Sequence, residues 1–360
     1  MTIPGDIIII GGGVVGSSIA LQLLQDGFKG RVSVVERDSS YQFASSALAF
    51  GGVRQQFMSP LNVGMVRYSL SVIDQLPEAQ FRQRGYLFLA DDSNWDRLKR
   101  RFEIQRSCGA ECEWLNVEDV QRLVPELRCD DLRGALFGPK DGYVDPRALL
   151  RTLRTRAEQL GAQYISHDVE KMESGPIYVI AAGAYSGVVA RAFGVEVPIT
   201  PLRQQLFRCE LPRPWTYEFP VVIEPGGLHW RTYPNNEIVI AKTNMNEPTG
   251  FRFGCDLDRY HQEVMPVLVD RLPEFRDLKL IFGWGGLYEM TPDHNGIIDR
   301  ISDRLYIAAG FSGHGLMMSP ATGKLISELI MTGRFQTLDA SALSLGRFAR
   351  NEMLIDESML

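Results

Sequence analysis

The chain of 360 residues is long enough for two or three domains. Its 38 basic and 44 acidic residues give a formal net charge of -6, which argues against the basic face typical of nucleic-acid binding. Hydrophobic residues make up 45% and charged residues 23%, an ordinary globular composition that argues against extended disorder.

The cysteines and histidines favour neither a disulfide framework nor a metal site. Five cysteines occur without a CxxC pair, and the five histidines lack ligand spacing. We therefore expect free thiols, a reducing compartment and no metal. The N-terminus runs directly into Asp6–Ile10 without the features of a signal peptide. No run approaches the roughly 18 apolar residues of a membrane span, so we expect a soluble, cytoplasmic protein.

The first forty residues predict one βαβ unit. Ile7–Ile10 is wholly apolar, as expected for a parallel strand buried on both faces. A glycine-rich turn and an amphipathic helical stretch follow, and a second strand at Val32–Val35 ends at Glu36. This order is typical of a nucleotide-binding unit.

Further along the chain, helical and strand patterns alternate. Helices are predicted over residues 67–76, 94–107, 115–123 (with Asn116 as cap), 145–160 and 316–331, strands over 178–180 and 305–309, and a strand-rich stretch over 207–282. Strands near both ends of the chain lead into glycine loops and helices, so distant segments are expected to share one sheet. The prediction is an α/β protein in which a Rossmann-like domain interleaves with an antiparallel-sheet (α+β) substrate domain. The expected boundaries are 1–75, 141–205 and 285–360 for the first domain, and 76–140 and 206–284 for the second.

The turn after the first strand fits a dinucleotide. Gly11 permits the tight turn, Gly13 lets a diphosphate approach the backbone, and Gly16 allows close packing of helix and strand. The diphosphate would lie at a helix N-terminus. Glu36 follows Gly16 by 20 residues, where its carboxylate can bind a ribose diol and repel the 2′-phosphate of NADP.

A second glycine-rich loop favours FAD over NAD. Gly310–Gly315 precedes a helix that starts near Leu316 and is expected at the same sheet. The N-terminus of that helix could stabilise negative charge on a reduced flavin ring.

The sequence resembles the FAD-dependent D-amino-acid oxidase superfamily, and within it the sarcosine oxidase and dimethylglycine dehydrogenase branch. The stretch from Gly51 to Phe57 most resembles the group called FAD-dependent oxidoreductase domain-containing proteins. The motifs that carry this resemblance occur in the family's order along nearly the whole chain: residues 8–16, 44–46, 51–57, 141–146, 181–186, 288–293 and 310–318.

The resemblance implies bound FAD and oxidation of a C–N bond, usually of an amino acid or N-methylated amino acid. Hydride passes to flavin N5, and the imine is then hydrolysed. Tyr288 matches a substrate-side tyrosine, and His314 joins it as a catalytic candidate. The implied cofactor residues are Gly11, Gly13, Val14, Val15, Gly16, Glu36, Arg37, Ser45, Ser46, Gly51, Gly52, Val169, Ala182, Gly183, Gly310, Gly313, His314, Gly315, Leu316 and Met317.

Departures from the family pattern narrow the expectation. Gly286 and Leu48 stand where relatives attach flavin through Cys or His, so FAD should be noncovalent. Phe57 and Met317 replace the cations that hold the sarcosine carboxylate, and Val239 replaces the lysine linked to oxygen activation. Sarcosine is therefore disfavoured, and oxidase and dehydrogenase both stay open.

Two arginines are candidates for the missing substrate anchor. Alternation along a predicted strand places His229, Arg231 and Tyr233 on one face, and a guanidinium suits bidentate binding of a carboxylate. Arg231 or Arg54 is therefore expected to bind an acidic group of the substrate. The segment 167–176 is also shorter than the strand meander that the family usually has there. Whether this shortening affects the adenine side of the cofactor or a partner surface stays open.

Three functions remain after these observations. The first is an FAD enzyme that oxidises an amine or amino acid. The second is an FAD enzyme acting on a 2-hydroxy acid, and the third is a non-catalytic flavoprotein subunit or assembly factor. Expected partners are a small-molecule substrate and no nucleic acid, with a homo- or hetero-oligomer left open.

Overall fold

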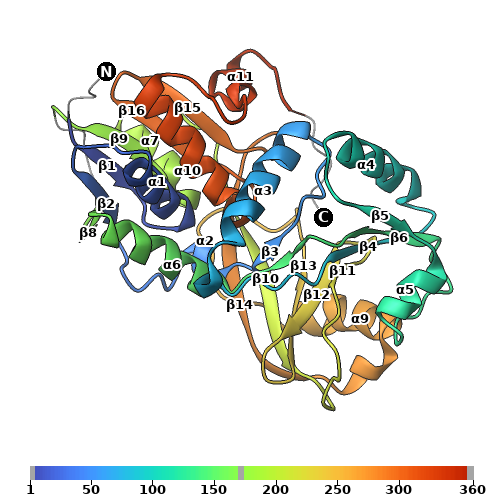
Figure 1. Ribbon diagram of the computed structural model, residues 1–360. Helices are drawn as coiled ribbons and strands as arrows, with labels where there is room; N and C mark the ends of the chain where they lie inside the picture. Colours follow the sequence, from blue (N-terminus) through green and yellow to red (C-terminus); the bar gives the residue numbers. More distant parts are fainter. Residues whose placement is uncertain (1–4, 169–173, 355–360) are drawn as a thin grey trace.

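The computed structural model describes residues 5–168 and 174–354, which form two sheet-based parts (Figure 1). A six-stranded sheet has the order β15-β16-β9-β1-β2-β8, and an eight-stranded sheet has the order β14-β10-β13-β12-β11-β4-β6-β5. A third, two-stranded sheet pairs β3 with β7. The six-stranded sheet comprises β1 (Ile7–Ile10), β2 (Val32–Glu36), β8 (Gln163–Ser166), β9 (Ile177–Ile180), β15 (Ile297–Ser302) and β16 (Leu305–Ala309). The other sheets comprise β3 (Gly52–Val53), β4 (Tyr86–Ala90), β5 (Glu113–Leu115), β6 (Gly134–Gly138), β7 (Gly142–Tyr143), β10 (Thr200–Glu210), β11 (Val221–Ile223), β12 (Leu228–Tyr233), β13 (Glu237–Lys242) and β14 (Lys279–Met290).

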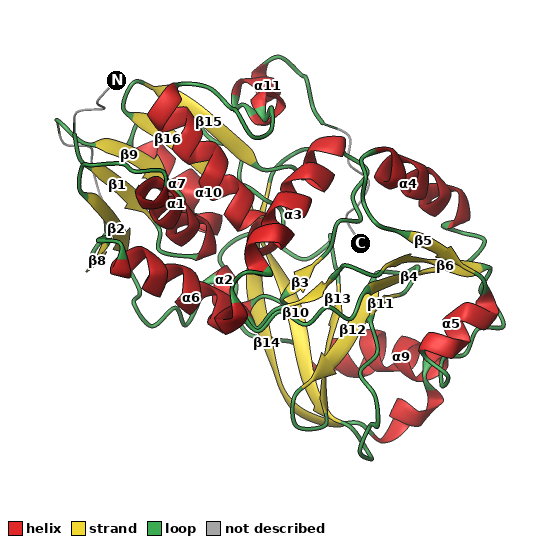
Figure 2. Ribbon diagram, viewed as in Figure 1, coloured by secondary structure: helices red, strands yellow, loops and turns green. Residues whose placement is uncertain are grey.

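The six-stranded sheet is parallel except for the β15–β16 pair, and helices cover both of its faces (Figure 2). Ile7 and Ile9 pack with residues of α1, α3, α6 and α10, whereas Ile10 packs in a second core with residues of α7. This division explains the wholly apolar first strand, which is buried on both faces. The α-helices are α1 (Val14–Gln25), α2 (Ser45–Leu48), α3 (Pro60–Ile73), α4 (Trp95–Ser107), α5 (Val117–Leu123), α6 (Pro146–Gln159), α7 (Ser186–Ala192), α8 (Leu257–Arg259), α9 (Met265–Arg271), α10 (Gly315–Thr332) and α11 (Gly346–Ala349).

The eight-stranded sheet is antiparallel apart from the parallel β4–β11 pair. Its longest strands, β10 and β14, pair so that Leu202 lies opposite Tyr288 and Gln204 opposite Gly286. One face packs against α5 and α9 through a core that includes Phe207, Trp230 and Tyr260. The two sheets therefore confirm the predicted combination of a Rossmann-like part with an antiparallel part.

Some predicted bounds differ from the structure. The helix predicted over 67–76 starts earlier, at Pro60, because Ser59 caps it by accepting from the Asn62 N–H, and it ends at Ile73. The predicted domain boundaries at 205 and 285 fall inside β10 and β14, since these strands run through both regions. The helix expected from Leu115 begins at Val117, with Leu115 in β5 and Asn116 as its cap.

The stretch predicted as strand-rich, 207–282, also contains helical structure. Residues 257–271 form α8, a π-helical turn and α9. Tyr260, Val264, Leu268 and Leu272 are buried at intervals of four, which is the helical period that the prediction overlooked. None of the helices in the described ranges is long and apolar enough to cross a membrane.

Candidate active site

A cavity of about 870 Å³ extends from the end of β1 to the eight-stranded sheet. Its walls come from the N-terminal turns of α1 and α10, the end of β2, α2, the segment after β9, and strands β10, β13 and β14. Most of the sequence-predicted cofactor residues line it: Gly11, Gly13, Val14, Val15, Glu36, Arg37, Ser45, Ser46, Gly51, Gly52, Ala182, Gly183, Gly313, His314, Gly315, Leu316 and Met317.

The glycine turn presents a helix N-terminus to the cavity. Gly13 is the N-cap of α1 and has no side chain to cap it, while the Val14 N–H donates to Ser46 Oγ at 3.1 Å. Gly16 lies outside the cavity wall, where a Cβ would come within 1.9 Å of Gly11 O. Gly16 therefore permits the close packing, and the first turn of α1 is left to face an anion.

The carboxylate of Glu36 lies beside this turn. Its Oε2 accepts from the Gly12 N–H at 2.8 Å and its Oε1 from the Asp38 N–H at 2.9 Å. Since each carboxylate oxygen can accept more than one hydrogen bond, Glu36 can still bind a diol. The guanidinium carbon of neighbouring Arg37 lies 3.5 Å from the ring centroid of Tyr185, another residue of the cavity wall.

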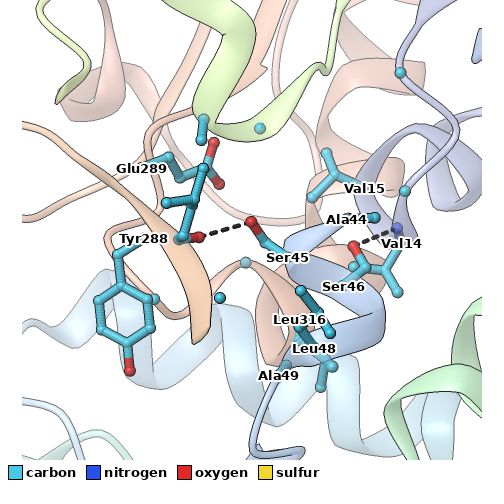
Figure 3. A pocket seen from close by; sticks show the side chains of 18 of the residues that line it. Val14, Val15, Ala44, Ser45, Ser46, Leu48, Ala49, Tyr288, Glu289 and Leu316 are labelled. Atoms are coloured by element: carbon cyan, nitrogen blue, oxygen red, sulfur yellow. Dashed lines mark hydrogen bonds between the residues drawn. The ribbon is translucent and has the colours of Figure 1, made fainter. Parts of the chain in front are cut away.

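Helix α2 joins the two parts of the protein at the cavity (Figure 3). Ser45 Oγ donates to Leu287 O on β14 at 2.6 Å, and Ser46 accepts from α1. Gly286 lies against Leu48, and a Cβ at Gly286 would be 3.3 Å from the Leu48 Cβ. The two residues from which noncovalent FAD was expected, Gly286 and Leu48, thus face one another here.

The second glycine loop forms the opposite wall. His314 is the N-cap of α10 without a side-chain capping bond, and Gly313, Gly315 and Met317 line the cavity with it. A Cβ at Gly313 would lie 2.5 Å from the ring of Tyr288, so this glycine allows that ring to pack on the loop. Gly310 is not part of the wall, and its N–H donates to Glu289 Oε2 at 2.9 Å.

Arg54 places a buried cation at the end of the cavity that the eight-stranded sheet borders. Its side chain is 2% exposed, and its Nη2 lies 3.2 Å from His314 Nε2. Its guanidinium carbon lies 4.4 Å from the ring centroid of Phe57, within range of a cation–π interaction. Burial and the charge of Arg54 lower the pKa of His314 well below its usual value, so that imidazole is neutral and can accept from Arg54.

Phenol and imidazole groups surround the same end. Burial raises the pKa values of Tyr86 and Tyr288, so both phenols keep their protons and can donate hydrogen bonds. Burial lowers the pKa of His229 to about 4, which keeps that ring neutral. Tyr86 has no motif in the sequence that marks it as a site residue, because the pairing of β4 within the sheet brings it to the cavity.

Arg231 is placed differently from Arg54. It is 3% exposed and lies outside the cavity wall, donating from Nε to Phe50 O at 2.9 Å and from Nη1 to Thr232 O at 3.0 Å. Alternation did place His229 and Arg231 on one face, but Phe50 contacts both of them there. Arg231 supports Phe50, which itself lines the cavity.

Two further expectations concerned the adenine contact of Val169 and the binding of metal ions. Val169, predicted near the adenine, lies outside the described residues. Within 5–168 and 174–354, no group of three or more His, Cys, Asp or Glu side chains is arranged to hold a metal ion. Glu289 was not among the predicted site residues, although it lines the cavity next to Tyr288.

The residues present fit FAD. A long cavity connects the N-terminus of α1, with the carboxylate of Glu36 beside it, to the N-terminus of α10, and glycines border it where a Cβ would clash. These features define a dinucleotide-binding oxidoreductase site that lies between the six-stranded and the eight-stranded sheet.

Comparison with known proteins identifies the family. The family described as "DAO: FAD dependent oxidoreductase" matches residues 6–329, so the chain belongs to it and is an FAD-dependent oxidoreductase. The chain is 30% identical to "FAD-dependent oxidoreductase domain-containing protein 1" of Bos taurus, with 99% of this chain and 87% of that protein covered. It is 25% identical to "Glycine oxidase" of Geobacillus kaustophilus (strain HTA426), with 92% and 94% covered. The solved structure of L-proline dehydrogenase from P. horikoshii aligns with a TM-score of 0.90 at 28% identity, covering 98% of this chain and 100% of that one.

Proposed function

We propose that this protein oxidises the C–N bond of an amino acid or an N-substituted amino acid, with noncovalently bound FAD as its cofactor. The observation that carries the proposal is the buried guanidinium of Arg54 at the end of the cavity that the eight-stranded sheet borders, beside Tyr86 and Tyr288. The names of the similar glycine oxidase and L-proline dehydrogenase, which are amino-acid enzymes, support the same class of substrate.

Arg54 is the proposed anchor of the substrate carboxylate. A guanidinium matches a carboxylate bidentately, and hydrogen bonds to charged groups each contribute about 1.5–3 kcal/mol when formed away from water. His314 holds one edge of the guanidinium through its Nε2, which fixes the direction in which Arg54 points. Tyr288 and Tyr86 remain protonated and can donate to the same carboxylate.

The chemistry that FAD supplies when bound is acceptance of a hydride from the carbon beside nitrogen. Leu206, Ala241, Phe50 and Met317 contribute apolar surface to the wall and exclude water from the reacting carbon. The N-terminus of α10 favours negative charge in the group bound beside it. No step requires an ionised histidine, which agrees with the lowered pKa values of His229 and His314.

Anaerobic mixing with a substrate panel tests this function. The panel contains amino acids, N-methyl amino acids and 2-hydroxy acids, and the readout is bleaching of flavin absorbance. Bleaching by an amino compound supports the proposal. Bleaching by hydroxy acids alone would assign alcohol oxidation, and the absence of bleaching by every compound would favour a non-catalytic role. Repeating the active reaction with oxygen distinguishes an oxidase from a dehydrogenase.

A variant pair tests the anchor. Arg54→Met keeps most of the side-chain volume and removes the charge, so KM for the amino acid should rise roughly 10- to 100-fold. The corresponding amide should be affected much less, because it lacks the carboxylate. The exposed Arg276→Met serves as the matched control. Equal effects of Arg54→Met on the acid and on its amide would exclude Arg54 as the anchor.

A further inference from the structure

Glu289 is a carboxyl group of the cavity that the proposed oxidation does not use. It follows Tyr288 on β14, and the two side chains leave the strand in opposite directions (Figure 3). Both line the cavity. The ring of Tyr288 packs on Gly313. Because the Glu289 side chain points the other way, it must face a different part of any molecule bound in the cavity.

Glycine backbone from two separate segments surrounds the Glu289 carboxyl. The Gly310 N–H donates to Oε2 at 2.9 Å, and a Cβ at Gly183 would lie 3.9 Å from the same oxygen. A Cβ at Gly315, the first residue of α10, would lie 3.3 Å from Oε1. The carboxyl is therefore held between the segment after β9 and the start of α10, the two backbone segments that resemblance to the family places along the cofactor.

The partners of Glu289 are backbone donors. Withdrawal from water raises the pKa of its carboxyl to about 7, and the N–H groups of Gly310 and Phe311 offset only part of this effect. A carboxyl held in this way keeps acceptor capacity toward the cavity, because its two oxygens together can accept about four hydrogen bonds. Toward the ionised form of this carboxyl, a bound group that faces it must donate.

Within FAD, only part of the molecule suits such a neighbour. The diphosphate is anionic, would repel the carboxylate, and already has the N-terminus of α1. The chain between the diphosphate and the flavin ring carries three hydroxyl groups, each a hydrogen-bond donor. We infer that Glu289 accepts a hydrogen bond from a ribityl hydroxyl of FAD and thereby fixes the cofactor chain between Gly183 and Gly315. The inference rests on the FAD dependence of the family and holds whichever substrate is oxidised.

Flavin exchange tests the inference without an activity measurement. Holoenzyme is incubated with equimolar mixtures of FAD and 2′-deoxy-, 3′-deoxy- or 4′-deoxy-FAD, and the flavins retained by the protein are separated and quantified. The wild type should prefer FAD over at least one analogue by about 10-fold, since a hydrogen bond to a charged group contributes at least that much. Glu289→Ala should retain FAD and that analogue equally, and Glu289→Gln, which keeps an acceptor, should show an intermediate preference.

The control is Glu237→Gln on β13. Glu237 is a partly buried strand carboxylate paired with Arg208 outside the cavity, so this variant should keep the preference of the wild type. A wild type that discriminates against none of the analogues, or a Glu289→Ala variant that discriminates fully, overturns the inference. Should Glu289→Ala fail to fold, Glu289→Gln decides the matter: a reduced preference supports the inference and an unchanged one contradicts it. Failure here would leave the substrate proposal standing, because that proposal is tested by flavin bleaching.

Discussion

Arg54 Nη2 and His314 Nε2 lie 3.2 Å apart although 260 residues separate them in the sequence. The contact joins the segment after β3 to the N-cap of α10. Arg54 can only donate, so the imidazole must accept through an unprotonated Nε2. The lowered pKa of His314 provides that state, so on this side the guanidinium of Arg54 is oriented by a neutral partner.

Replacing His314 should therefore weaken substrate binding through Arg54. We expect His314→Ala to raise KM for the amino-acid substrate about 10-fold, the loss of roughly one hydrogen bond to a charged group. Steady-state kinetics measure the effect, with exposed His261→Ala as the control. His314→Gln, whose amide oxygen can accept from Arg54, should recover part of the loss. If His314→Ala lowered kcat with KM unchanged, the imidazole would act on the reaction itself and not on Arg54.

The turn between β1 and α1 should not tolerate a methyl group at Gly16. A Cβ there would approach Gly11 O to 1.9 Å, so Gly16→Ala must displace either the helix or the turn. We expect at least a 10-fold loss of FAD affinity, measured as flavin retained after gel filtration. Gly226→Ala is the matched control, because a Cβ at Gly226 meets no atom within 4 Å. Normal FAD retention by Gly16→Ala would contradict this account of the turn.

The cofactor half of the site was predictable because its signals are local. Gly11, Gly16 and Glu36 lie within one βαβ unit, and the spacing of this unit reports its geometry directly. The start of α10 could be placed in the same way, from a strand followed by glycines. Family resemblance then supplied residues such as Ser45, which the structure places at the cavity wall.

The substrate half of the site was harder to predict from the sequence, because it depends on contacts between distant segments. Alternation along β12 correctly grouped His229 with Arg231, yet it could not reveal that Phe50, far away in sequence, covers Arg231. Tyr86 reaches the cavity because β4 pairs with β11 in a register that places Tyr86 opposite Val221. Glu289 lay inside a recognised motif, but the glycines around its carboxyl come from two other segments, the one after β9 and the loop before α10.

Asp141 should make stability depend on pH. Burial raises its pKa to about 7, although hydrogen bonds from Gln55 and the charge of Arg54 act in the opposite direction. An unfolded aspartate has a pKa near 4, so between about pH 4 and 7 the folded state holds a proton that the unfolded state has lost. The contribution of the protonated Asp141 to stability is therefore complete below about pH 4 and is lost as pH rises toward 7.

Asp141→Asn, which cannot titrate, should remove this dependence. The free energy of unfolding of the wild type relative to the variant should fall as pH rises from 5 to 7, by at most about 1.4 kcal/mol per pH unit. Chemical denaturation at several pH values measures the difference. The exposed Asp339→Asn should show a constant difference over that range, because the pKa of Asp339 is lowered and it stays ionised. A flat difference for Asp141→Asn would contradict the assigned protonation.

The buried ion pair between Arg347 and Asp293 should stabilise the fold, because it holds α11 against the segment that follows β14. Arg347 donates to Asp293 at 2.7 and 2.9 Å, and both side chains are 1% exposed. Burial alone would raise the pKa of Asp293, but Arg347 outweighs it and the pKa is lowered. Arg347→Met leaves this carboxylate buried without its partner, so the free energy of unfolding should fall by about 3–5 kcal/mol. Arg350→Met, which breaks the exposed pair with Glu352, should cost at most about 1 kcal/mol in the same denaturation experiment.

The same substitution of Arg347 should also affect flavin binding. Because Asp293 follows Tyr288 and Glu289 by only a few residues, Arg347→Met should release flavin more readily than the wild type does. A destabilised variant with unchanged flavin retention would show that the ion pair acts on the fold alone.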